Sequence, residues 1–562
     1  MKKIISTTMA AVLMAAALVG CGGGQQGSTG GTETTAAQTQ AAAGGETTQA
    51  AAEAETTQAA ASGEAGNKTI TLAMVSAWDS VIPFDTTSSY SDVVLDLIYD
   101  KLVFLKQDGT YEPRLADTWE MSDDNTELTV HLNENAKWQD GEPVTAEDVV
   151  FTCKVYGSPT VAAVRQNNVS PFAGFKESDD SLKVEAVDEH TVKFTCAQPT
   201  NMDFLFFIKF RDIYILPSHI LGDLPFDQIR ESDYWEKPIG SGPCIYESQI
   251  SGERMEFTAN KNYHLKTPDW DRFVVKVVAT PSLLSGLINN EIDILAGNVA
   301  SLQLSDWEMA QQQENLICQS NESVGYQYMA INTSKEYLTP KVRQAINLAI
   351  NREAIVSGLL KGEGEPAFGP FSKSHLYYNE VINVGYDPEK AKQLLAEEGW
   401  DGSHELVFSV PTGNAIREQA AVIIQQNLQE IGIKTNIESA DFATHLNKVR
   451  ESNYDLGLIG SGGSPDPSEC VINFKPDHVN NFSQLSDWSI YDTGAAGESA
   501  FSFEDRKVAY DAYQNLLVEQ VPFCFLYFQN NLFAQNKRIG GVVDIEDASQ
   551  LNRAVWNWTV SE

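Results

Sequence analysis

The chain has 562 residues and a formal net charge of −38 at neutral pH. Such an acidic balance repels nucleic acids and anionic lipid headgroups, which excludes a function carried by a basic surface. Residues 1–66 hold five acids and two lysines, which leaves 72 acidic and 37 basic residues in the remainder. That remainder of nearly 500 residues exceeds a usual single domain and predicts two or three lobes.

The chain begins with a segment typical of export. Two lysines precede an apolar stretch, residues 4–19, which is too short for a comfortable membrane span. Gly20 is a small residue before a cut, which predicts a signal peptide over residues 1–20. The run Leu18–Cys21 resembles the lipobox of bacterial lipoproteins, and this implies a diacylglycerol anchor on Cys21. A plain secretory peptide is the alternative.

Residues 21–66 form a low-complexity segment built almost entirely from Gly, Ala, Thr, Gln, Ser and Glu. After Cys21 it has no aromatic and no large aliphatic residue, so burial cannot offset the entropy of ordering it. We therefore expect a lipid-anchored disordered linker. A flexible coil of roughly 45 residues has a reach of about 35–40 Å.

Four local patterns begin the folded part of the chain. Residues 70–75 read as a strand that leads to Trp78, and residues 93–105 carry an apolar helical stripe followed by an extended end. A hairpin is predicted over residues 119–132. Thr145 and Asp148 have the spacing of a capping box, which predicts the beginning of a helix.

Residues 114–124 and 136–151 resemble the family 5 extracellular solute-binding proteins of ABC importers, which include oligopeptide- and dipeptide-binding proteins. The likeness extends over about residues 68–540. The further matching segments follow in the same order: Ile239–Pro243, Asn260–Tyr263, Leu287–Ile294, Tyr328–Asn332, Val342–Glu353, Tyr386–Ala391, Gly399–Trp400, Gln429–Ile433 and Tyr454–Leu456. Each segment is a weak signal by itself, and their common order carries the resemblance.

The second half of the chain alternates helices with strands. Asp387 and Pro388 begin a predicted helix, and residues 415–431 form another that leads into a strand over 433–437. Arg343 and Arg352 fall on one predicted helix, where nine residues place them on nearly opposite faces. We interpret both as structural or surface charges. The alternation predicts an α/β fold.

The resemblance implies a bilobed periplasmic-binding-protein-like fold, with two α/β lobes joined by a hinge and an extra subdomain. By the layout of the family, lobe I would comprise residues 67–102, 196–318 and 529–562. The extra subdomain would comprise residues 103–195, and lobe II residues 319–528.

The resemblance also implies that a loop after the Tyr454–Asp455 strand lines the ligand site. Peptide-binding relatives carry a tryptophan there and, three positions later, an aspartate that pairs with the peptide's α-amino group. Counted from Tyr454, these positions fall on Ser461 and Ser464; counted back from Asp466, the aspartate position falls on Gly463. Without a carboxylate there, about 1.5–3 kcal/mol of ammonium recognition is lost unless another group substitutes. Asp466 could substitute, and a turn residue before proline is its alternative role.

A glycine-rich wall suits a bulky or uncharged solute, and aromatic side chains would stack on it. Trp78 is the leading aromatic candidate, Trp488 the next, and Tyr491 and Phe482 lie near Trp488 in the sequence, with core packing as the alternative for each. The predicted ligand-binding residues are Trp78, Ser461, Gly462, Gly463, Ser464, Asp466 and Trp488.

The histidines and cysteines give no support for chemistry at a metal centre. They are scattered without ligand spacing, so we predict no metal site and no cofactor. Most of the cysteines after Cys21 are expected to be buried free thiols, although disulfides are possible in an exported protein. Neither Gly-x-Ser-x-Gly nor His-Glu-x-x-His occurs, and we predict no catalytic residue.

These observations predict a lipid-anchored protein on the outer face of the cytoplasmic membrane that binds a solute and does not act as an enzyme. As a monomer it would capture an oligopeptide or dipeptide and deliver it to the permease and ATPase subunits of an ABC importer, with no nucleic-acid partner. An oligosaccharide or a metal chelate is the alternative solute. The functions of a surface sensor and of a secreted hydrolase are less favoured.

Overall fold

The computed structural model describes residues 68–106, 110–202, 205, 210–463, 466–542 and 551–561. Residues 64–562 belong to one unit. The predicted signal peptide, Cys21 and the predicted linker lie outside the described residues.

Lobe I is built on a seven-stranded mixed sheet, sheet A, in the order β12-β19-β11-β1-β10-β9-β8. The predicted first strand is confirmed as β1, which lies parallel to β10 and β11 at the centre of this sheet. The strands are β1 (Thr69–Met74), β8 (Cys244–Ile250), β9 (Arg254–Ala259), β10 (Arg272–Val277), β11 (Ile294–Leu295), β12 (Leu316–Asn321) and β19 (Asn531–Asn536). Its helices are α1 (Ser89–Ile98), α4 (Ser218–Leu221), α5 (Leu283–Ile288) and α6 (Leu304–Gln311).

A four-stranded antiparallel sheet in the order β4-β5-β7-β6 continues the core of lobe I. Its strands are β4 (Ala116–Met121), β5 (Glu127–Leu132), β6 (Val184–Asp188) and β7 (Thr191–Thr195). The predicted hairpin is confirmed by the β4–β5 pair. The capping box of Thr145 and Asp148 is also confirmed, and it begins α2 (Ala146–Gly157). Short pairs elsewhere are β2 (Val103–Leu105) with β3 (Tyr111–Pro113) and β20 (Ile539–Gly540) with β21 (Thr559–Val560).

Lobe II is built on a six-stranded sheet, sheet F, in the order β14-β18-β13-β17-β15-β16. Its strands are β13 (Tyr326–Ile331), β14 (Gly364–Pro366), β15 (Glu405–Pro411), β16 (Lys434–Ala440), β17 (Leu456–Ser461) and β18 (Phe523–Gln529). Its helices are α7 (Pro340–Ala349), α8 (Arg352–Leu359), α9 (Pro388–Glu397), α10 (Ala415–Glu430), α11 (Phe442–Arg450), α12 (Ser468–Val471), α13 (Ser489–Ser499) and α14 (Phe503–Gln520). The α/β prediction is confirmed.

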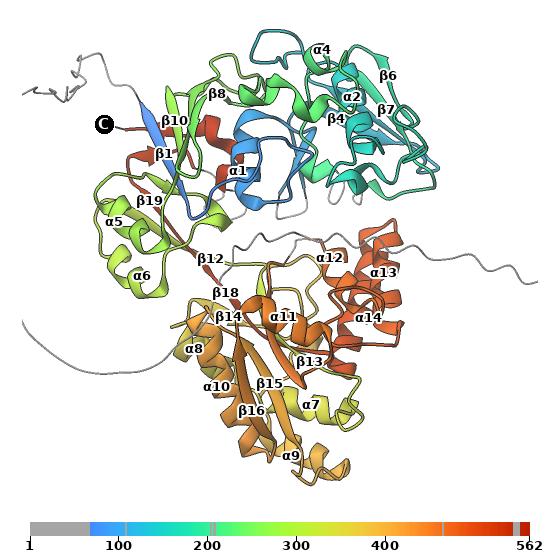
Figure 1. The fold of residues 1–562 in the computed structure, drawn as a ribbon, viewed down its shortest axis with the longest axis vertical. Helices are drawn as coiled ribbons and strands as arrows, with labels where there is room; N and C mark the ends of the chain where they lie inside the picture. The colour runs from blue at the N-terminus through green and yellow to red at the C-terminus, as the bar shows by residue number, and fades with distance from the viewer. Residues whose placement is uncertain are drawn as a thin grey trace, which may run out of the picture. The chain divides into compact units, whose positions relative to one another are not determined.

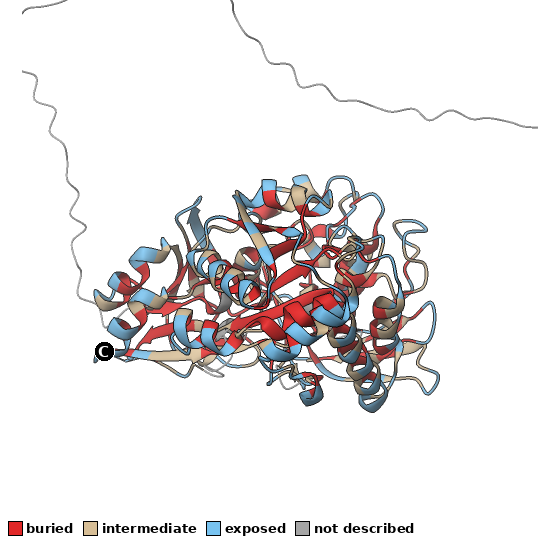
Figure 2. Ribbon diagram, turned by 90° about the horizontal axis from the view of Figure 1, so that it is seen from below, coloured by how far each residue is buried: buried red, intermediate tan, exposed pale blue. Residues whose placement is uncertain are grey.

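The alternation of β13 gives sheet F two buried faces. Met329 and Ile331 belong to one hydrophobic cluster, and Tyr326, Tyr328 and Ala330 belong to another. Successive side chains of a strand point to opposite faces, so helices must cover both sides of this sheet. In Figure 2 the strands are accordingly buried, while the helices expose their outer faces.

In the described part of the chain, two crossings connect the two sheets. Residues 322–325 join β12 of sheet A to β13 of sheet F, and Asn530 alone separates β18 from β19. Figure 1 shows β18 and β19 following one another from one sheet to the other. The predicted residue boundaries of the lobes and of the extra subdomain stay a prediction.

The helix predicted to carry both Arg343 and Arg352 is wrong, because two helices form there. Ile350 is extended, and the Asn351 side chain accepts a hydrogen bond from the Ala354 amide to begin α8. Both arginines are buried, and they donate to carbonyls: Arg343 Nε to Gln520 O at 2.7 Å and Arg352 Nε to Phe525 O at 2.6 Å. Burial lowers the pKa of both, that of Arg343 to about 10. They are structural residues.

The other predicted helices agree with the structure. Asp387 caps α9 by accepting a hydrogen bond from the Lys390 amide at 2.9 Å, and α10 coincides closely with the apolar repeat over 415–431. Among the described residues, no helix combines the length and the apolar character that a membrane crossing requires. The six cysteines after Cys21 are free thiols, all buried except the half-buried Cys318.

Candidate functional site

The carboxyl ends of two parallel strands of sheet F create the candidate site. Phe408 of β15 pairs with Leu456 of β17, and the two strands end near residues 411 and 461. Residues 412–414 then lead into α10, and the glycine-rich loop follows β17. In open α/β sheets, ligands bind outside the carboxyl ends of the strands, so this edge is where a solute site is expected.

Arg417 is the principal cation at this edge. It lies in the first turn of α10, and its Nε donates a hydrogen bond to Gln327 Oε1 at 2.9 Å. Gln327 belongs to β13, where it pairs with Gly460 of β17. A Cβ on Gly460 would lie 2.8 Å from Arg417 Nη2 and still closer to the Gln327 amide. The missing side chain of Gly460 therefore provides the space that both polar groups occupy.

No described carboxylate balances the charge of Arg417. The side chain is half-buried, and none of the described carboxylates lies within ion-pair distance of it. Burial lowers the pKa of Arg417 but leaves a guanidinium protonated at neutral pH. A partly desolvated cation with only a neutral amide partner is a suitable receptor for an anionic group of a solute.

A neutral imidazole is among the groups close to Arg417. His445 is fully buried, and its Nδ1 lies 2.9 Å from Ser409 Oγ on β15. Burial, together with the nearby charges of Arg417 and Lys448, lowers the pKa of His445 to about 4. The imidazole is therefore neutral at physiological pH, and Arg417 supplies the positive charge.

The glycine-rich loop packs tightly against the first crossing. Ser461 Oγ accepts a hydrogen bond from the Gly463 amide at 3.2 Å, and Ser461 pairs with Tyr326 of β13. Gly463 has a φ of +68°, and a Cβ there would overlap the Val324 carbonyl, so only glycine fits. A Cβ on Gly462 would meet no atom within 4 Å. Ser464 lies outside the described residues.

Asp466 is engaged within the protein. Its carboxyl is 2% exposed, accepts a hydrogen bond from the Ser468 amide at 2.8 Å, and lies 3.7 Å from Arg506 Nη2. Arg506 is equally buried and lies over the rings of Tyr377 and Tyr510. These contacts give Asp466 a structural role at the beginning of α12, and its contact with a solute stays a prediction.

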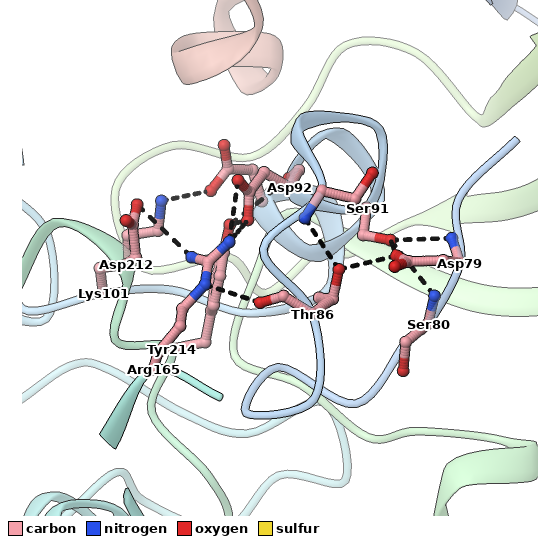
Figure 3. Close-up of polar contacts among 11 residues, drawn as sticks. Asp79, Ser80, Thr86, Ser91, Asp92, Lys101, Arg165, Asp212 and Tyr214 are labelled. Atoms are coloured by element: carbon pink, nitrogen blue, oxygen red, sulfur yellow. Dashed lines mark hydrogen bonds and ion pairs between the residues drawn. The ribbon is translucent and has the colours of Figure 1, made fainter. Parts of the chain in front are cut away.

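Trp78 follows β1 of sheet A, and hydrogen bonds fix both its own side chain and that of the next residue. Its Nε1 donates a hydrogen bond to Gln249 Oε1 at 3.0 Å. The neighbouring Asp79 carboxylate accepts hydrogen bonds from Ser91 Oγ at 2.5 Å and Thr86 Oγ1 at 2.7 Å, as Figure 3 shows. Burial raises the pKa of Asp79, but these hydrogen bonds outweigh it and keep the pKa below its usual value. The half-buried indole is therefore positioned in advance.

The remaining aromatic candidates separate into two kinds. Trp488 is 42% exposed beside α13 and makes an edge contact with Tyr491, whereas Phe482 is buried in the core of lobe II. No hydrogen bond, ion pair or ring contact among the described residues joins Trp78 or Trp488 to residues 460–463. That either tryptophan shares a site with the loop at Ser461, Gly462 and Gly463 stays a prediction.

The sequence reasoning missed Arg417 and Gln327. One signal was available for Arg417, because an arginine in the first turn of a helix opposes the helix dipole. Nothing in the sequence marks Gln327, whose role depends on the strand opposite it. A separate small depression in lobe I, lined by Asp96, Tyr99, Asp100, Lys101, Val103, Phe104 and Arg114, includes none of the predicted ligand residues.

Two α/β lobes connected by two chain crossings, with a cationic site at strand ends, define the bilobed class of binding proteins. The comparison with known families identifies the family within this class. The chain belongs to the bacterial extracellular solute-binding proteins, family 5, whose middle-region model matches residues 110–481. The predicted family is thereby confirmed.

The most informative relatives span most of the chain. The oligopeptide-binding protein AppA of Bacillus subtilis is 27% identical over 489 residues, which cover 81% of this chain and 85% of AppA. Heme-binding protein A of Haemophilus influenzae is 29% identical over 392 residues, covering 66% and 70% of the two chains. The solved structure of the ABC transporter substrate-binding protein CtaP of Listeria monocytogenes has a TM-score of 0.78 at 24% identity and covers 88% of this chain and 99% of CtaP. That likeness concerns the fold.

Proposed function

We propose that this protein captures a short peptide between its two lobes and delivers it to the permease and ATPase subunits of an ABC importer. The main observation behind this proposal is that Arg417 is a half-buried cation with no carboxylate partner among the described residues. A peptide with a free α-carboxylate provides the missing anion. The mechanism is binding without chemistry, in which the closed form must hold the solute more tightly than the open form.

The names of the relatives support a peptide. The matched proteins include the oligopeptide-binding protein AppA and the di/tripeptide-binding protein 1 of Pseudomonas aeruginosa. The planar guanidinium of an arginine holds its N–H donors in a fork that matches the two oxygens of a carboxylate. Gln327 and the backbone of residues 460–463 would complete the contacts with the solute.

A non-peptide solute is the second candidate, and the composition of the loop favours it. Residues 461–463 and the described Asp466 offer no free carboxylate for an α-ammonium group. Heme-binding protein A and a structure of NikZ from Campylobacter jejuni with Ni(L-His) belong to the matched proteins. A carboxylate-bearing chelate would satisfy Arg417 equally well.

Two binding measurements separate these candidates. Native mass spectrometry of protein purified from rich medium would identify a co-purified solute. Calorimetry would then compare peptides that end in a carboxylate with the same peptides ending in an amide. We expect wild type to prefer the carboxylate by about 10- to 100-fold, the value of one charge-assisted hydrogen bond.

Arg417→Met should remove that preference and leave the affinity for the amide almost unchanged. The control is Arg450→Met, because Arg450 is an exposed arginine of the neighbouring α11. A peptide that binds equally with either terminus would contradict the role of Arg417. A co-purified sugar or chelate would contradict the proposal that the solute is a peptide and would favour the second candidate.

The lipid anchor on Cys21 is part of the proposal. Two acyl chains would hold the protein stably on the outer face of the cytoplasmic membrane, and the linker would set the volume that the monomer searches for its permease. Cys21→Ser should move the protein from the membrane fraction into the soluble exported fraction. Unchanged membrane retention would contradict the anchor.

A further inference from the structure

Glu363 connects the two lobes at the second crossing. It lies in lobe II, in the short segment between α8 and β14. Its Oε1 accepts a hydrogen bond from Trp307 Nε1 at 2.7 Å, and its Oε2 accepts one from Ser320 Oγ at 2.5 Å. Trp307 belongs to α6 and Ser320 to β12 of sheet A, so both donors lie on the sheet A side of the crossing.

The crossing itself closes this network. Asn530, between β18 and β19, donates its backbone amide to the Glu363 carbonyl at 3.2 Å. The Asn530 side-chain amide donates to Ser320 Oγ at 2.9 Å. The crossing residue is therefore fixed to Glu363 on one side and to Ser320 on the other. Glu363 and Ser320 are in turn hydrogen-bonded to each other.

The carboxylate has no competing role in the described structure. No lysine, arginine or histidine among the described residues pairs with Glu363, so its partners are neutral donors across the crossing. Hydrogen bonds to an ionised acceptor are about twice as strong as neutral ones and are more directional. The segment that must bend when the lobes rotate is thus restrained by charge-assisted contacts.

We propose that Glu363 is a positioning residue for lobe closure: it fixes the pivot at Asn530, so that the lobes rotate along one path and the site in lobe II meets its counterpart in register. This inference rests on the proposed function, because a fixed pivot matters only if the lobes close on a solute. Hinges absorb closure in a few residues at the ends of elements, which describes Asn530.

The test measures the distance between the lobes directly. Spin labels at Glu291→Cys in lobe I and Gln429→Cys in lobe II occupy exposed positions, and Cys318→Ser removes the half-buried thiol. Double electron–electron resonance on the full chain without solute should give a distance distribution about twofold wider for Glu363→Ala than for wild type. Glu322→Ala is the matched control, because Glu322 is an exposed acid at the first crossing.

A second variant protects the test against a folding defect. Trp307→Phe keeps an aromatic ring in the core of lobe I but removes the Nε1 donor. We expect a smaller widening from it, and the double variant should be no wider than Glu363→Ala, because the two changes remove the same contact. With an equimolar pool of di- to pentapeptides, Glu363→Ala should bind about tenfold more weakly than wild type.

Two failures can be told apart. If Glu363→Ala and Trp307→Phe leave the distribution unchanged while peptides still shift the wild-type distance, the pivot is refuted and the proposed function stands. If peptides leave the wild-type distance unchanged, the proposed function fails, whereas a wider distribution in Glu363→Ala still supports the pivot. Equal widening in Glu322→Ala would also refute the inference, because loss of charge alone would explain it.

Discussion

Arg165 in lobe I and Arg417 in lobe II are both withdrawn from solvent, but within the described part of the chain only Arg165 is paired with carboxylates. Arg165 lies 2.9 Å from Asp92 and 3.5 Å from Asp212, and its Nε donates to the Thr86 carbonyl (Figure 3). Arg417 has the amide oxygen of Gln327 instead. The complete cluster stabilises lobe I, whereas the incomplete one is suited to a solute.

The largest expected effect breaks the complete cluster. Arg165→Met should reduce the free energy of unfolding by about 3 kcal/mol, because Asp92 and Asp212 both lose their arginine partner and only Lys101 still acts on Asp92. Burial already raises the pKa of Asp92, so a more weakly paired carboxylate there is costly. Urea denaturation of the non-acylated exported protein measures the loss.

The matched change Arg417→Met should alter the free energy of unfolding by less than about 1 kcal/mol, since no carboxylate is left behind. If the two variants lose similar stability, Arg417 is a structural residue like Arg165. That outcome would remove the contrast between the two lobes.

The next effect concerns the space beside Arg417. Gly460→Ala should weaken solute binding by about tenfold, because the new methyl displaces the ends of Arg417 and Gln327. Those ends are flexible, and Gly460 has no positive φ, so the melting temperature should change little. Gly385→Ala is the control, because Gly385 is an exposed glycine of lobe II away from this site, has no positive φ, and a Cβ there meets open space. Calorimetry that finds both variants equally impaired would contradict the assigned geometry of the site.

A smaller effect follows from the neutral histidine behind Arg417. The unfolded chain protonates a histidine near pH 6.5, whereas burial keeps the pKa of His445 at about 4 in the folded state. The unfolded state therefore binds more protons between these values, and stability should fall as the pH decreases from about 6.5 to about 4.

His445→Asn should make this part of the pH dependence flatter, although it lowers stability at neutral pH. The exposed His404 supplies the control, and His404→Gln should retain the wild-type slope. Chemical denaturation at several pH values gives the slopes. An unchanged slope in His445→Asn would mean that other groups carry the dependence.

The smallest effect tests the aromatic side of the site in lobe I. Trp78→Ala should weaken solute binding several-fold, since one aromatic contact contributes about 0.5–1.5 kcal/mol beyond burial. The parallel change Trp488→Ala tests the other predicted tryptophan, which is more exposed and lies in lobe II. Wild-type affinity in Trp78→Ala would restrict the site to lobe II.

The sequence predicted those elements well whose ends and faces are set by residues close together in the chain. The capping box at Thr145, the cap at Asp387 and the apolar repeat of α10 each depend on neighbours within a few residues. The single helix predicted through Arg343 and Arg352 failed because Asn351 caps a second helix, and burial made both arginines donors to distant carbonyls.

The site was predicted only in part, because most of its contacts join residues that are far apart in the sequence. The loop around Ser461 could be found by counting from Tyr454, because loop and strand are adjacent in the chain. Asp466 could be seen as a carboxylate, but its burial against Arg506 comes from a helix 40 positions later. The orientation of Trp78 likewise depends on Gln249 of another strand.

The sequence by itself determined the acidic balance, the α/β alternation and the family, because these reside in composition and local order. The tertiary structure decided which residues meet. Arg417 contacts Gln327, a residue 90 positions earlier, beside Gly460, because β13 and β17 pair in register and α10 begins at the same edge of sheet F. The imbalance of charge that suits a solute exists only after that sheet has formed.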